Sequence, residues 1–382
     1  MKDIKKVLRK NLPLSRQIEN HQKIIEKLDS IEHMLAQLEN REASHHQKII
    51  ENFRSIRHVI SSTKVIVPAF PLLTDRFMKM IPVTIGLSAT KKYIVEDKNG
   101  SKYFLKIEPS ENYSSVEKFF LMLEKLYFAG VPMPRPIEYG KCEEGAYILS
   151  SFIGRNSKNS FIATTLEIEM PTLTDEKKYL LGLRAGRALR RIHQVSFLRN
   201  KDTCREWNWR FPKWAKDLVE FYVKSPNKFD GYEYYLETLQ EPLDWITQRP
   251  SCLLHHDYGS HNLLWEKEEL WVIDFGSTEA KDGDPYYDFR NIFISGLRFP
   301  HFSTGTIHGY FDGIVPQDFF KLTKFYAAWS IMDSLHHAKN SKRVESITKS
   351  AKNFLLSYDN MKAEQPSWYF EQIDIQGLEG KV

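Results

Sequence analysis

The stretch LLHHDYGSHNLLW, residues 253–265, places three histidines, an aspartate and an asparagine between apolar ends. A second apolar run, LWVIDFG at residues 270–276, contains another aspartate near its end. Short apolar runs around a polar loop are typical of neighbouring β-strands. Three interpretations of the polar residues are open: metal ligands, parts of a phosphate-transfer site, or side chains of an ordinary turn.

The oxygen-bearing side chains favour phosphate transfer. Asn262 and Asp274 would lie at the ends of neighbouring strands. Amide and carboxylate oxygens in that position can hold Mg²⁺, and nucleotide phosphates can complete its shell. Asp257, five residues before Asn262, would lie across the loop, where it can accept the proton of a substrate hydroxyl.

The other two interpretations explain less. His255, His256 and His261 lack the i, i+4 spacing of paired ligands on a helix. The asparagine and the aspartate offer oxygen ligands, which suit Mg²⁺ better than a transition metal. An ordinary turn does not explain why IDFG follows at this distance.

A strand-rich segment earlier in the chain can supply phosphate contacts. Residues 85–107 are predicted to form a β-hairpin, because two β-rich runs flank DKNG at residues 97–100. The second run contains Lys106, and a strand can fix an ammonium group against two phosphates. Alone this signal is weak, because most strand lysines are solvated.

The elements after the hairpin can orient that lysine. Residues 114–130 are predicted to be a helix that ends at a glycine, with Glu117 in its first turn. A glutamate there can pair with the lysine and hold its direction. Glu124 is a second candidate for this partner, and residues 145–154 are predicted to form a further strand.

These motifs together resemble a known family. Lys106, Glu117, HHDYGSHN, IDFG and DGDPYYDF occur here in the order found in the aminoglycoside phosphotransferase and choline kinase superfamily. The resemblance spans roughly residues 80–360, and the five elements in order are specific although each alone is weak. It implies an α+β, bilobal protein-kinase-like fold, with a small antiparallel β-sheet in the N-lobe and a mainly helical C-lobe.

The resemblance also implies the roles of individual residues and the cofactors ATP and Mg²⁺. Asp257 corresponds to the catalytic base, and Asn262 and Asp274 to the metal ligands. His255 and Asp288 would support the loop rather than react, and Asp284 matches another acid of the family pattern. The nucleotide contacts implied are Lys106 with Glu117, the loop residues Gly86 and Ser88, and the strand residues Leu149 and Ser151.

Two departures from related patterns bear on the substrate. The residue between His255 and Asp257 is commonly glycine in the family, whereas here it is His256. The HRD and APE patterns of protein kinases do not occur, so a small hydroxyl compound is favoured over a protein acceptor. The candidates are an aminoglycoside-like antibiotic, an amino alcohol such as choline or ethanolamine, and a sugar, including one of a surface glycan.

The C-terminal helices are expected to shape the acceptor pocket, within residues 204–223 and 309–338. The first segment holds three tryptophans that can receive a cationic amine, although packing the lobe is their more usual role. Acids for a polycationic acceptor are present but sparse. The tryptophans are Trp207, Trp209 and Trp214, and the acids are Asp312, Asp318 and Asp333.

The N-terminal residues form a separate segment. HQKIIEKLDSIEHML at residues 21–35 recurs as HQKIIENFRSIRHVI at residues 46–60, and nine of the fifteen positions are identical. Apolar residues spaced by four and three predict a coiled-coil-like helical segment, either one helix or a hairpin. The predicted domains are therefore 1–66, the N-lobe at 67–153 and the C-lobe at 154–382.

Charge and composition agree with this division. Residues 1–64 hold 13 of the 54 Lys and Arg and 8 of the 49 Asp and Glu, which leaves 41 of each sign for the rest. The balanced body does not indicate nucleic acid as a partner. Three scattered cysteines, no apolar signal peptide and no run long enough to span a membrane predict a cytoplasmic protein.

The repeated segment generates the first prediction. We expect residues 15–64 to drive homo-oligomerisation, because a repeated apolar seam is stabilised by burial against another helix. Light scattering of the full chain and of a chain lacking residues 1–64 measures this, and an unchanged mass refutes it. A scaffold without catalysis, assembled through this segment, is the rival from another functional class.

Overall fold

The computed structural model describes most of the chain after residue 75. The chain divides into two units, Met1–Ala69 and Phe70–Val382, and all described residues belong to the second unit. The predicted coiled-coil segment, Gly86 and Ser88 lie outside the described residues. Described are residues 76–83, 90–109, 112–157, 160–162, 164–195, 201–225, 228–241, 249–275, 282–312 and 314–372.

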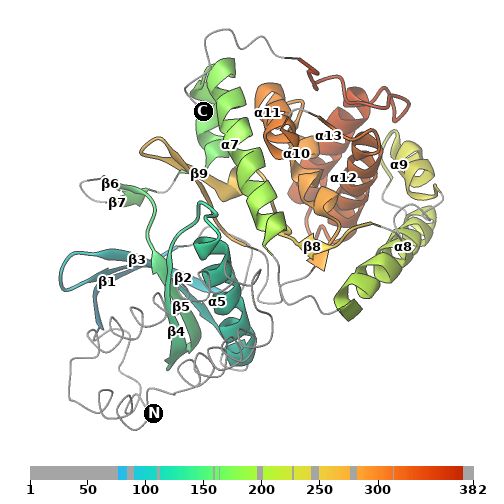
Figure 1. Ribbon diagram of the computed structural model, residues 1–382. Coiled ribbons are helices and arrows are strands. Elements are labelled where there is room, and N and C mark those ends of the chain that lie inside the picture. The colour runs from blue at the N-terminus through green and yellow to red at the C-terminus, as the bar shows by residue number, and fades with distance from the viewer. Residues whose placement is uncertain are drawn as a thin grey trace, which may run out of the picture. The chain divides into compact units, whose positions relative to one another are not determined.

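The N-lobe contains a five-stranded antiparallel sheet in the order β1-β2-β3-β5-β4 (Figure 1). The predicted hairpin is confirmed, because β2 pairs with β3 across a turn at Asp97–Ser101. The side chain of Asp97 accepts hydrogen bonds from the backbone N–H groups of Asn99 and Ser101, at 2.8 and 2.9 Å. The strands are β1 (Phe77–Pro82), β2 (Lys91–Asp97), β3 (Lys102–Glu108), β4 (Pro136–Cys142) and β5 (Gly145–Ser151).

The two faces of this sheet have different partners. Leu105, Ile107 and Leu149 pack in a small apolar cluster on one face. Because successive side chains of a strand point to opposite faces, Lys106 points to the other face. That face also carries Ile148 and is covered by helix α5 (Tyr113–Phe128), whose apolar side chains join the main core.

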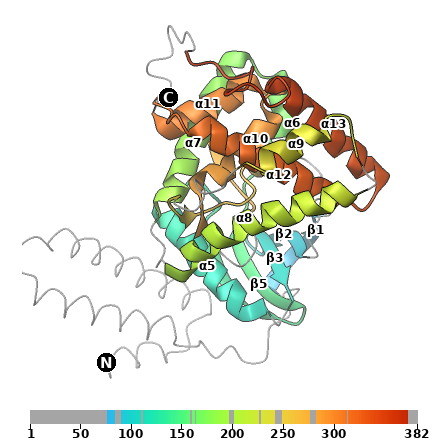
Figure 2. The same ribbon diagram turned by 90° about the vertical axis from the view of Figure 1, so that its right-hand side faces the viewer.

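The C-lobe is mainly helical and holds the larger part of the core (Figures 1 and 2). The long helix α8 lies along the outside of this lobe in Figure 2 and contacts α12. Short elements before α7 include the strand pair β6 (Arg155–Ser157) and β7 (Ser160–Ile162) and the helix α6 (Leu166–Glu169). The main helices are α7 (Asp175–Gln194), α8 (Lys201–Lys224), α9 (Tyr232–Leu239), α10 (Arg290–Ser295), α11 (Pro300–Phe311), α12 (Phe319–His336) and α13 (Ser341–Ser357).

Helices α7 and α11 pack together with their backbones close. A Cβ atom added to Gly186 would lie 2.1 Å from the carbonyl oxygen of Thr306, and one added to Gly309 would lie 2.1 Å from that of Leu183. Glycine is therefore required sterically at these positions. The packing matters for function, because the carbonyl of Ala185 on α7 accepts a hydrogen bond from Tyr258 of the polar loop at residues 255–262, and His193 on α7 contacts Asp288.

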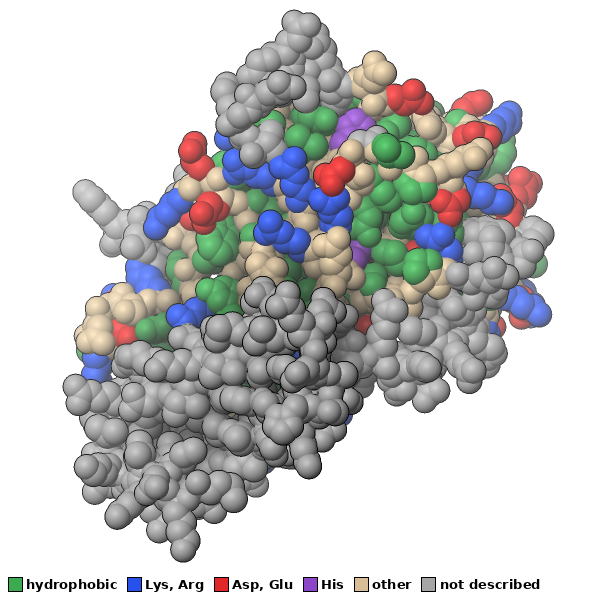
Figure 3. Space-filling model, in the orientation of Figure 1, with side chains coloured by type: hydrophobic (Ala, Val, Ile, Leu, Met, Phe, Trp, Pro, Cys, Tyr) green, Lys and Arg blue, Asp and Glu red, His purple; other side chains and the backbone are tan. Residues whose placement is uncertain are grey.

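Basic side chains of α7 connect it to other parts of the molecule. Figure 3 shows Lys and Arg side chains gathered near the middle of the described surface, around the position of α7 in Figure 1. Arg191 donates to the carbonyl of Gly130 in the N-lobe at 2.8 Å, and Arg190 pairs with Asp312 at 2.5 Å. The lobes are also joined where the N–H of Val272 donates to the carbonyl of Pro132 at 2.7 Å.

No helix among the described residues is long and apolar enough to cross a membrane.

The α7–α11 contact generates a stability prediction. We expect Gly186→Ala to lower the free energy of unfolding by at least about 2 kcal/mol, because the helices must separate to admit the methyl group. The gain in helix propensity, about 1 kcal/mol, does not offset this cost. Chemical denaturation measures the change. Arg187→Ala on the exposed side of the same helix is the control and should have little effect; equal stability of the two variants would contradict the prediction.

Candidate active site

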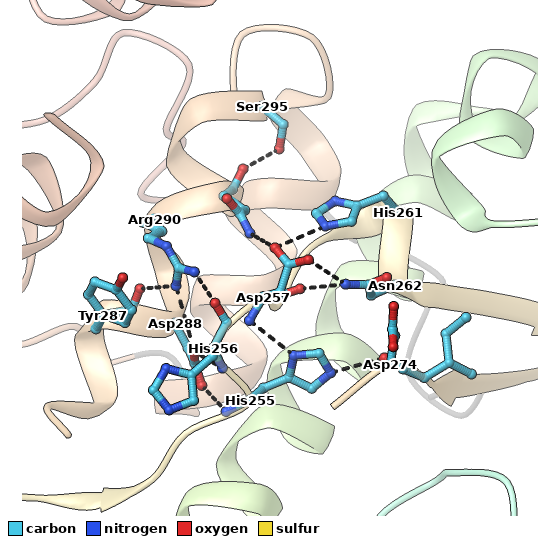
Figure 4. Close-up of polar contacts among 12 residues, drawn as sticks. His255, His256, Asp257, His261, Asn262, Asp274, Tyr287, Asp288, Arg290 and Ser295 are labelled. Atoms are coloured by element: carbon cyan, nitrogen blue, oxygen red, sulfur yellow. Dashed lines mark hydrogen bonds and ion pairs between the residues drawn. The ribbon is translucent and has the colours of Figure 1, made fainter. Parts of the chain in front are cut away.

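The polar loop lies next to a small hairpin that gathers the predicted metal ligands. Strands β9 (Leu263–Glu266) and β10 (Glu269–Val272) pair antiparallel, with Leu263 opposite Val272. Asn262 precedes β9 and Asp274 follows β10, so both lie at the same end of the hairpin, and the N–H of Ile273 donates to the carbonyl of Asn262 at 3.0 Å. Figure 4 shows Asp274 beside Asn262, and the side chains of Asn262 and Asp257 directed at each other.

The buried carboxylate of Asp288 holds the start of the loop. Its Oδ2 accepts from the N–H of His255 at 2.6 Å, and its Oδ1 accepts from the N–H of His256 at 2.8 Å. His193 from α7 contacts Oδ2 through Nε2 at 3.1 Å. Burial by itself raises the pKa of Asp288, but the hydrogen bond and charge of His193 and the charges of His256 and His255 lower it to about 2. The carboxylate is therefore ionised when it orients the loop.

His255 links the loop to the hairpin. Its ring is fully buried, with Nε2 3.1 Å from the carbonyl of Ile273 and Nδ1 3.3 Å from the N–H of Asp257. These two partners require a proton on Nε2 and a lone pair on Nδ1, which is the neutral ring. Burial lowers the pKa of His255 and so favours the neutral form, although nearby carboxylates oppose it. The geometry is that of a supporting residue.

Asp257 is oriented by three side chains and remains half-exposed. Its Oδ2 accepts from the amide of Asn262 at 3.0 Å, and its Oδ1 accepts from the amide of Asn291 at 2.9 Å. His261 Nε2 lies 3.2 Å from the same Oδ1. A carboxylate held in this way presents its remaining lone-pair positions in one direction.

The ion pair with His261 keeps Asp257 ionised. Burial raises the pKa of Asp257, but the hydrogen bond and charge of His261 and the charge of Arg290 lower it well below its usual range. For His261, burial lowers the pKa, but the hydrogen bond and charge of Asp257 raise it by more than burial lowers it. The net shift of the His261 pKa is therefore upward. Each partner thus stabilises the charged form of the other.

Asn262 and Asp274 offer oxygen atoms that fit Mg²⁺. The side-chain nitrogen of Asn262 donates to both the backbone and the carboxylate oxygen of Asp257, at 2.9 and 3.0 Å, which turns its Oδ1 away from Asp257. Asp274 is 48% exposed and has a left-handed backbone, with φ of 55°. No group of three His, Cys, Asp or Glu that can hold a metal occurs among the described residues. Mg²⁺ held between nucleotide phosphates needs only one or two carboxylates from the protein.

The predicted contact between Lys106 and Glu117 is wrong for this structure, because each residue has another partner. Lys106 Nζ lies 3.2 Å from Glu108 on the same strand, and 5.6 Å from the ring centre of Phe119. Glu117 accepts from the hydroxyl of Tyr139 at 2.7 Å. The acid was expected in the first turn of this helix. Helix α5 begins at Tyr113, so Glu117 lies beyond the first turn.

The two predicted residues of β5 do not share a sheet face with Lys106. Leu149 pairs with Leu105 and packs in the small apolar cluster, and the sheet alternation places Ser151 on the same face. Ser151 Oγ accepts from the N–H of Arg135 at 2.8 Å. The side chains at these positions therefore point away from the sheet face that carries Lys106.

Sequence reasoning missed several site residues. Asn291 holds Asp257, His193 holds Asp288, and Arg290 donates to the carbonyl of His256 while its guanidinium lies 4.1 Å from the ring centre of Tyr287. Lys92 Nζ lies 3.4 Å from Asp274 Oδ2. The one signal for Arg290 and Asn291 was their position directly after DGDPYYDF; the other two contacts join distant elements.

His256, the departure from the family pattern, has the backbone conformation that explains the usual glycine. Its φ is 67°, in the left-handed region that glycine adopts without cost. The bond from its N–H to Asp288 and the bond from Arg290 to its carbonyl hold this conformation. Its ring lies 6.3 Å from that of Tyr287.

Residues expected near an acceptor are only partly available. Asp312 pairs with Arg190 and Asp318 with Arg249, which also bonds the buried Asp284. Trp214 is 38% exposed and stacks on Trp329 of α12 at 6.3 Å. The side chains of Trp207 and Trp209 lie outside the described residues.

The fold is shared with solved phosphotransferases. The GDP complex of aminoglycoside 2'-phosphotransferase-IIIa gives a TM-score of 0.54 at 15% identity and covers 79% of this chain and 97% of that chain. A choline/ethanolamine kinase family protein from Mesorhizobium loti gives a TM-score of 0.51 at 14% identity and covers 78% of this chain and 94% of that chain. The streptomycin–ATP ternary complex of APH(2")-IIa gives 0.51 at 16%, covering 74% and 93%. At these identities the likeness shows the fold, and it confirms the predicted protein-kinase-like architecture.

The sequence identifies the family. The model of the phosphotransferase enzyme family matches residues 79–317, more than half of the chain, so the chain belongs to this family. This membership confirms the predicted family and the predicted enzyme class, a phosphotransferase with an alcohol group as acceptor. No curated protein matches the chain in a sequence search.

The buried carboxylate generates a prediction about stability and pH. Because the pKa of Asp288 is lowered in the folded state, its charge stabilises the fold above about pH 4, and this contribution is lost as the pH falls toward 2. The difference in pKa corresponds to about 2 kcal/mol. We therefore expect Asp288→Asn to lower the free energy of unfolding by at least this amount at pH 7, and by progressively less below pH 4.

Urea denaturation between pH 7 and pH 3 measures this dependence. Asp217→Asn, at an exposed ion pair on α8, is the matched control and should change stability little at any pH. A deficit for Asp288→Asn that stays constant over this pH range would contradict the proposed origin of the stabilisation.

Proposed function

We propose that this enzyme transfers phosphate from ATP, in the presence of Mg²⁺, to a hydroxyl group of a small molecule such as an aminoglycoside-like antibiotic, an amino alcohol or a sugar. The observation that carries the proposal is the arrangement around Asn262, whose amide bonds Asp257 while its backbone bonds the segment that carries Asp274. One loop and one hairpin thus bring a candidate base and two candidate metal ligands together.

Asp257 is assigned as the base that receives the proton of the acceptor hydroxyl. Its carboxylate is ionised, oriented by Asn262 and Asn291, and accessible. Its lowered pKa makes it a weak base, which suits phosphoryl transfer, because a loose transition state needs an aligned nucleophile more than early removal of the proton.

The metal and nucleotide contacts are assigned from the same geometry. When bound, Mg²⁺ neutralises charge on the phosphates, and we assign Asn262 Oδ1 and the Asp274 carboxylate as its protein ligands. Lys106 is assigned to the phosphates, since it lies on the sheet face opposite the small apolar cluster. We assign the remainder of the nucleotide to the loop with Gly86 and Ser88 and to the backbone at Leu149 and Ser151. Glu117 is assigned a supporting role, because it bonds α5 to Tyr139 of β4.

The acceptor is assigned to the side of the C-lobe that carries α8 and α12. Tyr287 lies between the loop and these helices, with its ring 6.2 Å from that of Trp329 and beneath the guanidinium of Arg290. Trp214 extends this aromatic surface and is partly exposed. A ring or amine of the acceptor can stack on it while its hydroxyl reaches Asp257.

A variant of the base tests the proposal. We expect Asp257→Asn to reduce turnover about 10²–10⁴-fold, the usual contribution of a positioned base. Affinity for the nucleotide should change little, because the side chain is assigned to the acceptor. Turnover is measured as nucleoside diphosphate release from ATP and GTP over a panel of aminoglycosides, amino alcohols and sugars.

Two controls sharpen the result. Asp230→Asn replaces an almost fully exposed carboxylate that pairs with Lys352, and should leave turnover unchanged. A thermal shift of the wild-type chain with nucleotide, with and without Mg²⁺, distinguishes the enzyme from the rival scaffold. Full activity of Asp257→Asn overturns the assignment of the base, and a wild-type chain that does not respond to nucleotide and Mg²⁺ favours the scaffold.

A further inference from the structure

We propose that Lys92 is a second lysine of the nucleotide-phosphate site, which Asp274 holds in the absence of nucleotide and which transfers to the phosphates when metal and nucleotide bind together. This inference rests on the proposed function and extends it. It concerns a residue that the sequence motifs did not indicate, on the strand next to that of Lys106.

The two lysines face each other across neighbouring strands. Lys92 on β2 is directly opposite Lys106 on β3 in the antiparallel register. Side chains opposite each other in such a pair lie on the same sheet face with their Cβ atoms about 5 Å apart. Both side chains are largely buried, with exposed fractions of 12% and 18%. Two like charges in this arrangement repel each other, so the site needs anions close by.

The protein supplies one carboxylate to each lysine, but the two carboxylates differ. Glu108 lies on the same strand as Lys106, is 13% exposed and accepts a further bond from Thr90 at 3.0 Å. Lys106 therefore has a fixed partner within the N-lobe. Asp274 belongs to the segment after β10, is 48% exposed and reaches Lys92 at 3.4 Å. The partner of Lys92 is thus the residue assigned to the metal.

This shared carboxylate couples metal and phosphate binding. A divalent cation on Asp274 competes with the ammonium of Lys92 for the same oxygen atoms. Without an added anion, the cation and both lysines are then close together, which is electrostatically unfavourable. Nucleotide phosphates supply the missing negative charge and give Lys92 a new partner. Lys92 should therefore oppose binding of the metal alone and favour binding of metal and nucleotide together.

The preceding residue offers a matched control. Lys91 precedes Lys92 on β2, so its side chain points to the other face of the sheet. It is 58% exposed and pairs with Glu144 at 2.7 Å, away from the site. Removal of either lysine changes the net charge of the chain by the same amount. A difference between the two variants therefore reports position rather than charge.

The test measures binding to the full-length protein in two titrations, without reliance on turnover. Mn²⁺ binding is followed by electron paramagnetic resonance in the absence of nucleotide, and ATP binding by calorimetry in the presence of Mg²⁺. We expect Lys92→Met to bind Mn²⁺ alone about 2–5-fold more tightly, because a competing partial ion pair is lost. It should bind ATP with Mg²⁺ about tenfold more weakly, because a charge-assisted hydrogen bond is lost.

The opposite signs of the two changes separate this role from a structural one. A variant that merely distorts the site weakens both titrations, and that result overturns the inference, as does wild-type behaviour in both. Lys91→Met should match the wild type, and Lys92→Arg should retain ATP binding. Failure of the proposed function is distinguishable, because the wild-type chain itself would then not bind ATP with Mg²⁺.

Discussion

The buried carboxylate of Asp288 is the contact on which the polar loop depends. It accepts hydrogen bonds from the N–H groups of two consecutive residues, His255 and His256. It is itself held by His193 from α7. A peptide segment anchored through two consecutive N–H groups can hardly rotate, so the direction of the following residue, Asp257, is fixed. The close packing of α7 on α11 places His193, so contacts in the centre of the C-lobe determine the position of the carboxylate assigned as the base.

This anchoring also stabilises an unfavourable backbone. His256 and Asp274 both have left-handed φ values, of 67° and 55°, and neither is glycine. Such residues cost of order 1 kcal/mol or more and persist where surrounding contacts determine their conformation. His256 has Asp288 and Arg290 on its two peptide groups. Asp274 follows Ile273, whose N–H is bonded to Asn262 and whose carbonyl is bonded to His255. One strained residue therefore directly precedes the assigned base, Asp257, and the other, Asp274, is itself an assigned metal ligand.

The sequence predicted the parts of the site that depend on local pattern. The hairpin predicted within residues 85–107, the end of α5 near Gly130, and the placement of Asn262 and Asp274 at the ends of neighbouring strands follow from alternation and turn residues. The contact between Lys106 and Glu117 did not follow, because the direction of a long side chain depends on its neighbours. Glu108 is on the same strand as the lysine, and Tyr139 is within reach of the glutamate.

The sequence pattern did not predict the contacts between elements that are distant in the sequence. His193 and Lys92 meet their carboxylates across 95 and 182 residues of sequence. Neither lies in a motif, and no spacing rule connects such positions. Strand alternation alone does not show that Leu149 faces away from Lys106, because the conclusion depends on the pairing of Leu105 with Leu149 across β3 and β5. That conclusion required the register of the two strands, which only the fold provides.

The charges around the assigned phosphate site are balanced in a way that bears on binding. In the structure, the cations and carboxylates neutralise one another: Lys106 pairs with Glu108, Lys92 with Asp274, and His261 with Asp257. Under the proposed function, binding of a nucleotide and a divalent cation would exchange the internal pair of Lys92 with Asp274 for external ones, instead of filling a site of one sign. Such an exchange would yield only the difference between two sets of ion pairs, so we expect moderate affinity together with geometric selectivity. Moderate affinity would suit the proposed reaction, which releases a nucleoside diphosphate in each cycle, because a site with uncompensated positive charge would retain that product.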